Sequence, residues 1–267
     1  MNRTWKQFLL EDQFDLKSLI PKETLHPGLW KNLELNPNVT KKLMEIAQDI
    51  IESMNLTAKI KDVVITGSMA SYNWHDSSDI DLHIILDFTE IDKNYDLVKK
   101  FLDQSRINWN KIHNIFIDGH EVELYFQDIN ERNETAGLYS IFHSSWSMQP
   151  KKIQDNIDLR TAEKKANAVS SNVEHLFELF GQKKYDECYK YASKVKERIR
   201  RMRQFGLSNG GIYSPENLAF KMLRNSEVLK KLSSLKVSAY DKMMSVDLRE
   251  GKSTNFNKKW SNFVKNV

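Results

Sequence analysis

IKDVVITGSMASYNWHDSSDIDLHIIL, residues 60–86, is the stretch of sequence that decides the fold. Its first six residues are rich in β-branched side chains and stop at Thr66, Gly67 and Ser68, which predicts a strand that ends in a tight turn. Ten residues separate Ser68 from the sequence DIDLHIIL, which predicts a second strand over residues 79–86. The stretch therefore predicts two strands joined through a glycine turn.

Two carboxylates, Asp79 and Asp81, stand two positions apart in the second predicted strand. Because side chains alternate between the faces of a strand, both point the same way, about 7 Å apart along the backbone. Like charges on one exposed face repel each other unless a cation lies between them. The pair therefore predicts a site for divalent metal ions.

A third acid is expected on a later strand, residues 121–126, where Glu121 and Glu123 share one face. Either could complete the metal site. Glu123 is favoured because apolar residues flank it on both sides, whereas Asp128 is interpreted as a strand-end residue. Exchanging each glutamate separately for glutamine would distinguish them.

Gly67 and Ser68 are the expected phosphate contacts. Glycine permits backbone angles that are closed to other residues and lets the chain approach a ligand closely. We expect a short helix to begin within residues 69–73, where its free N–H groups, together with the Ser68 hydroxyl, would receive the triphosphate of a nucleotide. Phosphate and metal would then meet at one place.

Helical spacing of apolar residues predicts a helix over residues 40–54, capped by Thr40, and another over residues 95–112. A short helix is expected within residues 5–10. From residue 161 onward we predict long charged helices over residues 162–180, 185–205 and 215–235, with Ser214 and Pro215 at the start of the last. Residues 206–211 are expected to be a flexible connection.

The pattern indicates an α+β domain over residues 41–150, preceded by an N-terminal segment, residues 1–40, and followed by an all-helical domain, residues 151–267.

The two halves carry opposite charge. Residues 1–150 hold 15 Lys/Arg and 23 Asp/Glu, and residues 151–267 hold 25 and 13. A basic half can follow a polyanion, although helical faces with excess Lys and Arg are also common in proteins that never meet nucleic acid. One predicted helix concentrates the cations: Lys194, Lys196, Arg198, Arg200, Arg201 and Arg203.

Other site types have little support. Cys188 is the only cysteine, which excludes an internal disulfide and a multi-thiolate zinc site and suits a reducing cytoplasm. His75 and His83 lie near the aspartates and could touch a nucleotide, but a structural role is favoured for both, and zinc-ligand spacing is lacking. No run of about 18 apolar residues occurs, so no membrane span is expected.

The pattern of a hydrophobic strand, Gly67-Ser68, Asp79-x-Asp81 and a later acidic strand resembles the polymerase β-like nucleotidyltransferase superfamily. The resemblance implies a small mixed sheet with helices, and Asp79, Asp81 and Glu123 as ligands of Mg²⁺ or Mn²⁺. It also implies that an NTP is the substrate, ATP or CTP above the others. Lys221 and Arg224 would reach its triphosphate, because a second domain completes that site in relatives.

Two further similarities concern the source of the chain. GSMASYNWHDSSDIDLHI and ENLAFKMLRNS resemble nucleotidyltransferases encoded by tailed bacteriophages. WKQFLLE, residues 5–11, resembles N-terminal segments of phage proteins that are packaged in the capsid, although an ordinary helix is the favoured interpretation. These similarities imply that the protein acts in the cytoplasm of an infected cell. Ser71-Tyr72 stands where antitoxin-type relatives carry Arg-Gly, so their protein-modifying activity is not implied.

These patterns predict a metal-dependent enzyme that moves a nucleotidyl group from an NTP to an acceptor hydroxyl, with RNA or tRNA favoured by the basic half. The alternative is an inactive module of the same fold that binds nucleic acid or a protein partner. Neither the acceptor nor the oligomeric state follows from the sequence.

Overall fold

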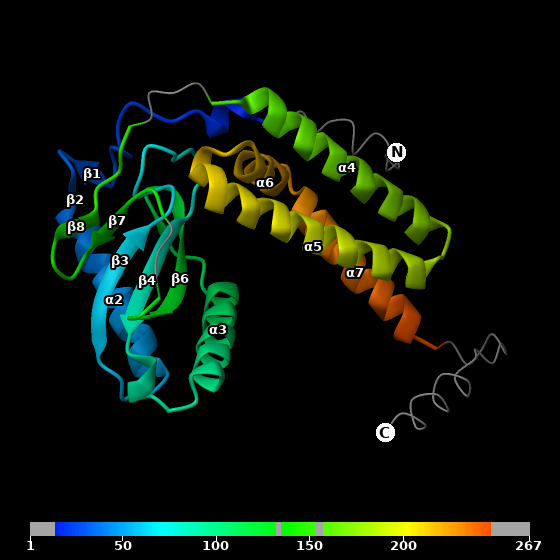
Figure 1. Ribbon diagram of the computed structural model, residues 1–267. Helices are drawn as coiled ribbons and strands as arrows, with labels where there is room; N and C mark the ends of the chain where they lie inside the picture. The colour runs from blue at the N-terminus through cyan, green and yellow to red at the C-terminus, as the bar shows by residue number, and fades with distance from the viewer. Residues whose placement is uncertain (1–13, 132–134, 153–156, 247–267) are drawn as a thin grey trace.

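A computed structural model describes residues 14–131, 135–152 and 157–246 (Figure 1). A mixed sheet with its helices forms one end, and four helices form an elongated bundle that extends from it. This is the predicted α+β arrangement with a helical C-terminal half. In the described residues, no helix has the length and apolar character needed to cross a membrane.

The six-stranded sheet has the order β5-β6-β4-β3-β7-β8. Its central strands are β3 (Ile60–Thr66), β4 (Ile80–Leu86) and β6 (His120–Asp128). β5 (Phe116–Ile117) pairs with β6 on one side, and β7 (Leu138–Ser140) and β8 (Ser145–Met148) extend the other. Only β4 and β6 are parallel among these pairs, and the register sets Asp81 opposite Glu123. The outer strands β5, β7 and β8 are two to four residues long, too short for a periodic signal in the sequence.

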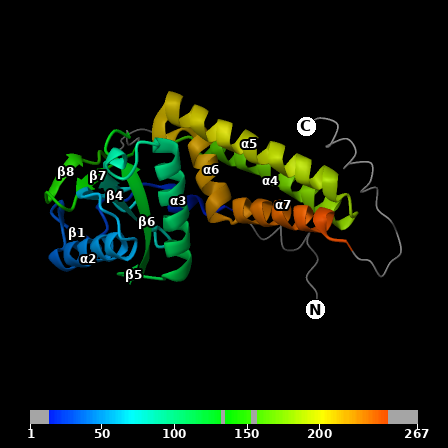
Figure 2. The same cartoon turned by 90° about the horizontal axis from the view of Figure 1, so that it is seen from below.

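Two helices accompany the sheet. α3 (Tyr95–Ile112) lies along β6, where the Asn110 amide bonds both backbone groups of Leu124 (Figures 1 and 2). α2 (Pro37–Ser53) packs its apolar face onto the core of the sheet. The expected start at Thr40 is wrong, because Asn36 caps the helix and Pro37 occupies its first turn. Short elements link these parts: η1 (Leu16–Leu19), β1 (Trp30–Lys31), β2 (Glu34–Leu35) and η2 (Phe88–Glu90).

The helical half consists of α4 (Leu159–Gly181), α5 (Tyr185–Gly210), α6 (Pro215–Asn225) and α7 (Val228–Met244), with η3 (Gly211–Tyr213) between α5 and α6. Two expectations are wrong here. Residues 206–210 continue α5 instead of forming a flexible connection. The predicted helix 215–235 is broken after Asn225, where Glu227 adopts a left-handed backbone with φ of 59°. The break lets α6 pack mainly on α4 while α7 packs mainly on α5.

Buried apolar side chains form two separate clusters. One contains the sheet, α2 and residues of the N-terminal segment such as Leu29 and Trp30. The other contains α4 to α7 and also takes Leu19 from the N-terminal segment. The division into 1–40, 41–150 and 151–267 stays a prediction. The expected helix at residues 5–10 lies outside the described residues.

Candidate active site

Asp79 and Asp81 lie at the same end of the sheet as the acids of β6. Asp79 directly precedes β4, Asp81 lies within it, and the parallel register pairs Asp81 with Glu123. Continuing that register by two residues sets Asp79 opposite Glu121. Both pairs therefore occupy one face at the same end of the two strands.

Burial and neighbouring acids disfavour the charged forms of both aspartates. Burial, followed by the charges of Glu123 and Asp79, raises the pKa of Asp81 to about 7, although Arg224 acts in the opposite direction. Burial and Glu123 likewise raise the pKa of Asp79. Across the described part of the chain, neither carboxylate has a hydrogen bond or an ion pair. Carboxylate oxygens are the ligands that Mg²⁺ prefers, so these donors fit a hard divalent ion chemically.

The third carboxylate is directed elsewhere. Glu123 accepts a hydrogen bond of 2.6 Å from the Tyr125 hydroxyl, two residues along the same strand. Within the described residues, no three His, Cys, Asp or Glu side chains are arranged so that they could hold a metal ion. A site formed by all three acids therefore requires these side chains to move closer together, and Glu123 Oε1, which takes no part in the bond with Tyr125, is the oxygen available to an ion.

Gly67 makes close contact with Asp81. Its φ is +74°, and a Cβ built on it would lie 2.0 Å from Asp81 Oδ2. Only glycine meets both demands, a left-handed backbone and room for the carboxylate. Residues 67–70 form turns, so the expected short helix at 69–73 is wrong. The chain turns back there because Ser71 donates from both its backbone N–H and its hydroxyl to the Ser68 carbonyl oxygen.

A cavity of about 180 Å³ lies between the sheet and the helical half. On the sheet side it is lined by Gly67, Ser68 and Asp81, and on the helical side by Lys221 and Arg224, as the family resemblance implies. Its remaining lining residues are Ser71, Asn73, Thr135, Ala136, Arg203, Leu207, Ile212, Asn217 and Phe220. Burial, Arg224 and Arg203 lower the pKa of Lys221 to about 8. Three cations, Arg203, Lys221 and Arg224, therefore line the cavity together with Asp81.

Arg203 is the cavity residue whose role sequence reasoning missed. It was grouped with five other cations of α5, but its guanidinium lies over the Phe220 ring at 4.2 Å from the centroid. The helical spacing of Arg203 in the sequence shows which face of α5 the residue occupies. It does not show which part of the protein lies against that face.

The two histidines near the acids have hydrogen-bonding partners within the protein. His83 Nδ1 lies 2.9 Å from Gln127 Oε1, and its ring stacks on Tyr125. His75 contacts the Ser77 hydroxyl within its own loop. Asp128 closes β6 and accepts hydrogen bonds from the backbone of Phe88 and Asn130, as expected of a strand-end residue. Cys188 is buried between helices.

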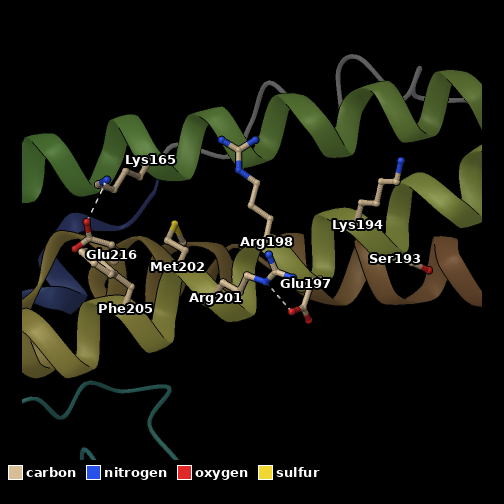
Figure 3. Close-up of a pocket in the computed structure, with 9 residues that line it drawn as sticks. All are labelled: Lys165, Ser193, Lys194, Glu197, Arg198, Arg201, Met202, Phe205 and Glu216. Atoms are coloured by element: carbon tan, nitrogen blue, oxygen red, sulfur yellow. Dashed lines mark hydrogen bonds and ion pairs between the residues drawn. The ribbon is translucent and has the colours of Figure 1, made fainter.

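The cations of α5 do not form one continuous face. Glu197 binds both Arg200 and Arg201, and Lys196 donates to the Ser233 hydroxyl. Arg198 and Lys194 instead line an open groove between α4 and α5 (Figure 3). The basic side of α5 therefore presents two separate surfaces.

Comparison with known families agrees with this geometry. Residues 44–143 match the family model of the nucleotidyltransferase domain. The matched stretch contains β3, the Gly67 turn, β4 and β6, and therefore the acids Asp79, Asp81, Glu121 and Glu123. It supports nucleotidyl transfer in general and leaves α4 to α7 outside. Searches among curated proteins and among solved structures gave no significant match.

Proposed function

We propose that this protein is a Mg²⁺-dependent nucleotidyltransferase that moves a nucleotidyl group from an NTP to an acceptor hydroxyl on RNA. One observation carries the proposal. The cavity between sheet and helices has the Gly67 turn and Asp81 on one wall and Lys221 and Arg224 on the other. An acid for a metal, Asp81, and cations for phosphates therefore line the same small space.

Each residue has a chemical role in this proposal. Asp79, Asp81 and Glu123 would hold Mg²⁺ or Mn²⁺, which when bound neutralises phosphate charge and lowers the pKa of an attacking hydroxyl. The acceptor oxygen bonds to the α-phosphorus, the bond to the bridging oxygen breaks, pyrophosphate leaves and the hydroxyl proton is released. Lys221 and Arg224 offset the charge of the departing pyrophosphate.

The turn at Gly67 lets the backbone come close to a bound nucleotide. With no side chain at this position, the chain passes against Asp81 and leaves backbone N–H groups and the Ser68 hydroxyl beside the cavity. Such groups stabilise phosphate oxygens without adding charge. We infer that they bind the triphosphate of the NTP, with ATP and CTP as the first candidates.

The charge of the chain supports an RNA acceptor. Residues 151–267 carry 12 more Lys/Arg than Asp/Glu, and this half provides the cationic wall of the cavity. The phage resemblance adds the proposal that the enzyme works in the cytoplasm of an infected cell. Mass spectrometry of purified virions would show whether any of it is packaged.

Label transfer tests the proposal. Purified protein is incubated with each α-phosphate-labelled NTP, Mg²⁺ or Mn²⁺, and total host RNA or lysate. We expect label in the RNA fraction, and loss of it by at least about a thousandfold in Asp79→Ala/Asp81→Ala, because bound metal contributes several kcal/mol. Label in protein instead would move the acceptor to a side chain.

One observation favours the alternative, an inactive module that only binds. Glu123 is held by Tyr125, and no ready metal cluster exists among the described residues. Absence of label transfer with every NTP, together with unchanged RNA binding in the double alanine variant, would support this alternative and contradict the enzyme.

A further inference from the structure

A second pocket lies directly beside the candidate active site. It has a volume of about 470 Å³ and lies between α5, α6 and α7. Arg203, Leu207 and Phe220 line both this pocket and the catalytic cavity, so the two share a wall. We call it the α5–α7 pocket. Anything bound there lies one side chain away from the space that contains Asp81.

Charge and shape make this pocket complementary to a polyanion with flat apolar parts. Its cations, Lys196, Arg200 and Arg203, follow one face of α5 at helical spacings of four and three residues. Neighbours at this spacing are about 5–6 Å apart, comparable with successive phosphates of an extended strand. Between them the surface is apolar, formed by Ile199, Leu207, Phe220, Leu229 and Leu232.

Arg203 and Phe220 form a stacked pair at the shared wall. The guanidinium covers one face of the ring, 4.2 Å from its centroid, and in the described chain Arg203 has no ion-pair partner. Its outer face is a planar cation. Bases of single-stranded nucleic acid stack on aromatic rings and on arginine planes without regard to sequence.

We propose that the α5–α7 pocket binds the end of a single-stranded nucleic acid acceptor. Phosphates lie at Lys196 and Arg200, a base stacks at the Arg203–Phe220 pair, and the terminal hydroxyl passes the shared wall toward Asp81. The direction toward Asp81 rests on the proposed function, whereas the binding itself does not.

The larger groove on the opposite side of α5 fits this ligand less well (Figure 3). Its volume is about 780 Å³, but two of its four cations are paired, Lys165 with Glu216 at 3.2 Å and Arg201 with Glu197 at 2.9 Å. In the α5–α7 pocket one of the three cations is paired, Arg200 with Glu197 at 2.7 Å. Glu216 and Glu197 line the groove, whereas no acid lines the α5–α7 pocket in the described chain. The groove also shares no lining residue with the catalytic cavity.

The two faces of α5 provide a matched comparison. Arg200 and Arg201 both bind Glu197, yet Arg200 lines the α5–α7 pocket and Arg201 lines the groove. Lys196 and Lys194 are divided in the same way. The test variant is therefore Lys196→Gln/Arg200→Gln, and its control is Lys194→Gln/Arg201→Gln, which removes the same charges from the same helix.

Binding is measured by fluorescence anisotropy with a labelled single-stranded RNA over a series of salt concentrations, alongside calorimetric titration with a non-hydrolysable NTP. We expect the test variant to bind RNA about tenfold more weakly, with a salt slope lower by about 0.7 for each lost phosphate contact, while the control stays within about twofold of wild type. NTP binding should be equal in all three proteins.

Equal weakening of test and control would overturn the proposal, because it would mean general attraction to a basic helix. So would absence of RNA binding by the wild type, or a test variant that loses NTP affinity instead. The assay needs no turnover, so an inactive enzyme would contradict the proposed function alone. If the enzyme transfers label to RNA but the test variant binds RNA as tightly as the wild type, only the proposal for the α5–α7 pocket is contradicted.

Discussion

Gly67 is the residue on which the geometry of the acids most directly depends. Adding a methyl group places a carbon 2.0 Å from Asp81 Oδ2 at a φ of +74°. We expect Gly67→Ala to lower the free energy of unfolding by about 2–4 kcal/mol, combining left-handed strain of about 1–2 kcal/mol with the steric conflict. Urea unfolding measures this.

Gly119 is the matched control, because its φ is +82° and nothing lies within 4 Å of an added Cβ. Gly119→Ala should cost only the strain, about 1–2 kcal/mol, and should leave label transfer intact. Equal costs at the two positions would show that the contact between Gly67 and Asp81 contributes nothing.

The identity of the third acid is also decided at a single residue. Glu123 lies opposite Asp81 in the register, and it contributes to the raised pKa of both aspartates. We expect Glu123→Gln to lower the transfer rate by at least about a hundredfold, because it removes a carboxylate that holds the metal ion in position. Glu121→Gln should lower the rate by much less, because Glu121 does not bind the ion. Steady-state kinetics would contradict this assignment if Glu121→Gln were the more damaging change.

At the scale of elements, the sequence predicts most of what surrounds the acids. The strands β3, β4 and β6 and the helix α3 follow their periodic patterns, because each has one face or both in the core. The breaks in the helical half could not be predicted. Glu227 adopts a left-handed conformation because packing of α6 and α7 on different partners requires it, and glutamate carries no local signal for that backbone.

Gly206 shows why the end of α5 was mistaken for a flexible connection. It lies within the helix and allows close packing, since an added Cβ would be 2.5 Å from Ser214 Oγ and 2.6 Å from Glu216 Cβ, at the start of α6. A glycine-rich sequence fits both a flexible linker and a close helix contact, and only the tertiary contact distinguishes them.

Alanine at position 206 therefore tests this contact. Alanine is normally better than glycine in a helix by about 1 kcal/mol, yet we expect Gly206→Ala to destabilise the protein by about 1–3 kcal/mol because it displaces the cap of α6. Gly181→Ala, where nothing lies within 4 Å, should be neutral or stabilising. Thermal and urea unfolding of both variants decide the matter, and a stabilised Gly206→Ala would refute the close packing.

At the scale of the whole molecule, the candidate site belongs to neither cluster of buried residues alone. The acids and Gly67 come from the sheet, and the cations come from α5 and α6. The sequence placed Lys221 and Arg224 in the site only through the family resemblance, and it gave no reason to choose Arg203 from the cations of α5. Contacts between segments more than 100 residues apart, such as the bond from the Tyr213 hydroxyl to Asn73 Oδ1, bring the halves together.

This joint arrangement predicts a pH dependence of NTP binding. Burial and the neighbouring arginines lower the pKa of Lys221 to about 8 in the free protein, and a bound triphosphate favours the charged form. Affinity should therefore fall as the pH rises above 8, by up to about tenfold per unit. Lys221→Arg should stay flat over the same range, because its charge persists. Titration calorimetry with a non-hydrolysable NTP between pH 7 and 9.5 measures this, and an equal decline in both proteins would assign it to another group.

The most direct measurement for the central claim is the binding of Mn²⁺ in the presence of a non-hydrolysable NTP, in wild type and in Asp81→Asn. The account predicts that the wild type binds the ion and that Asp81→Asn, which keeps the size of the side chain and removes its charge, binds it at least about tenfold more weakly. Equal affinity in the two proteins, or no binding by the wild type, would contradict the claim that these acids hold the metal.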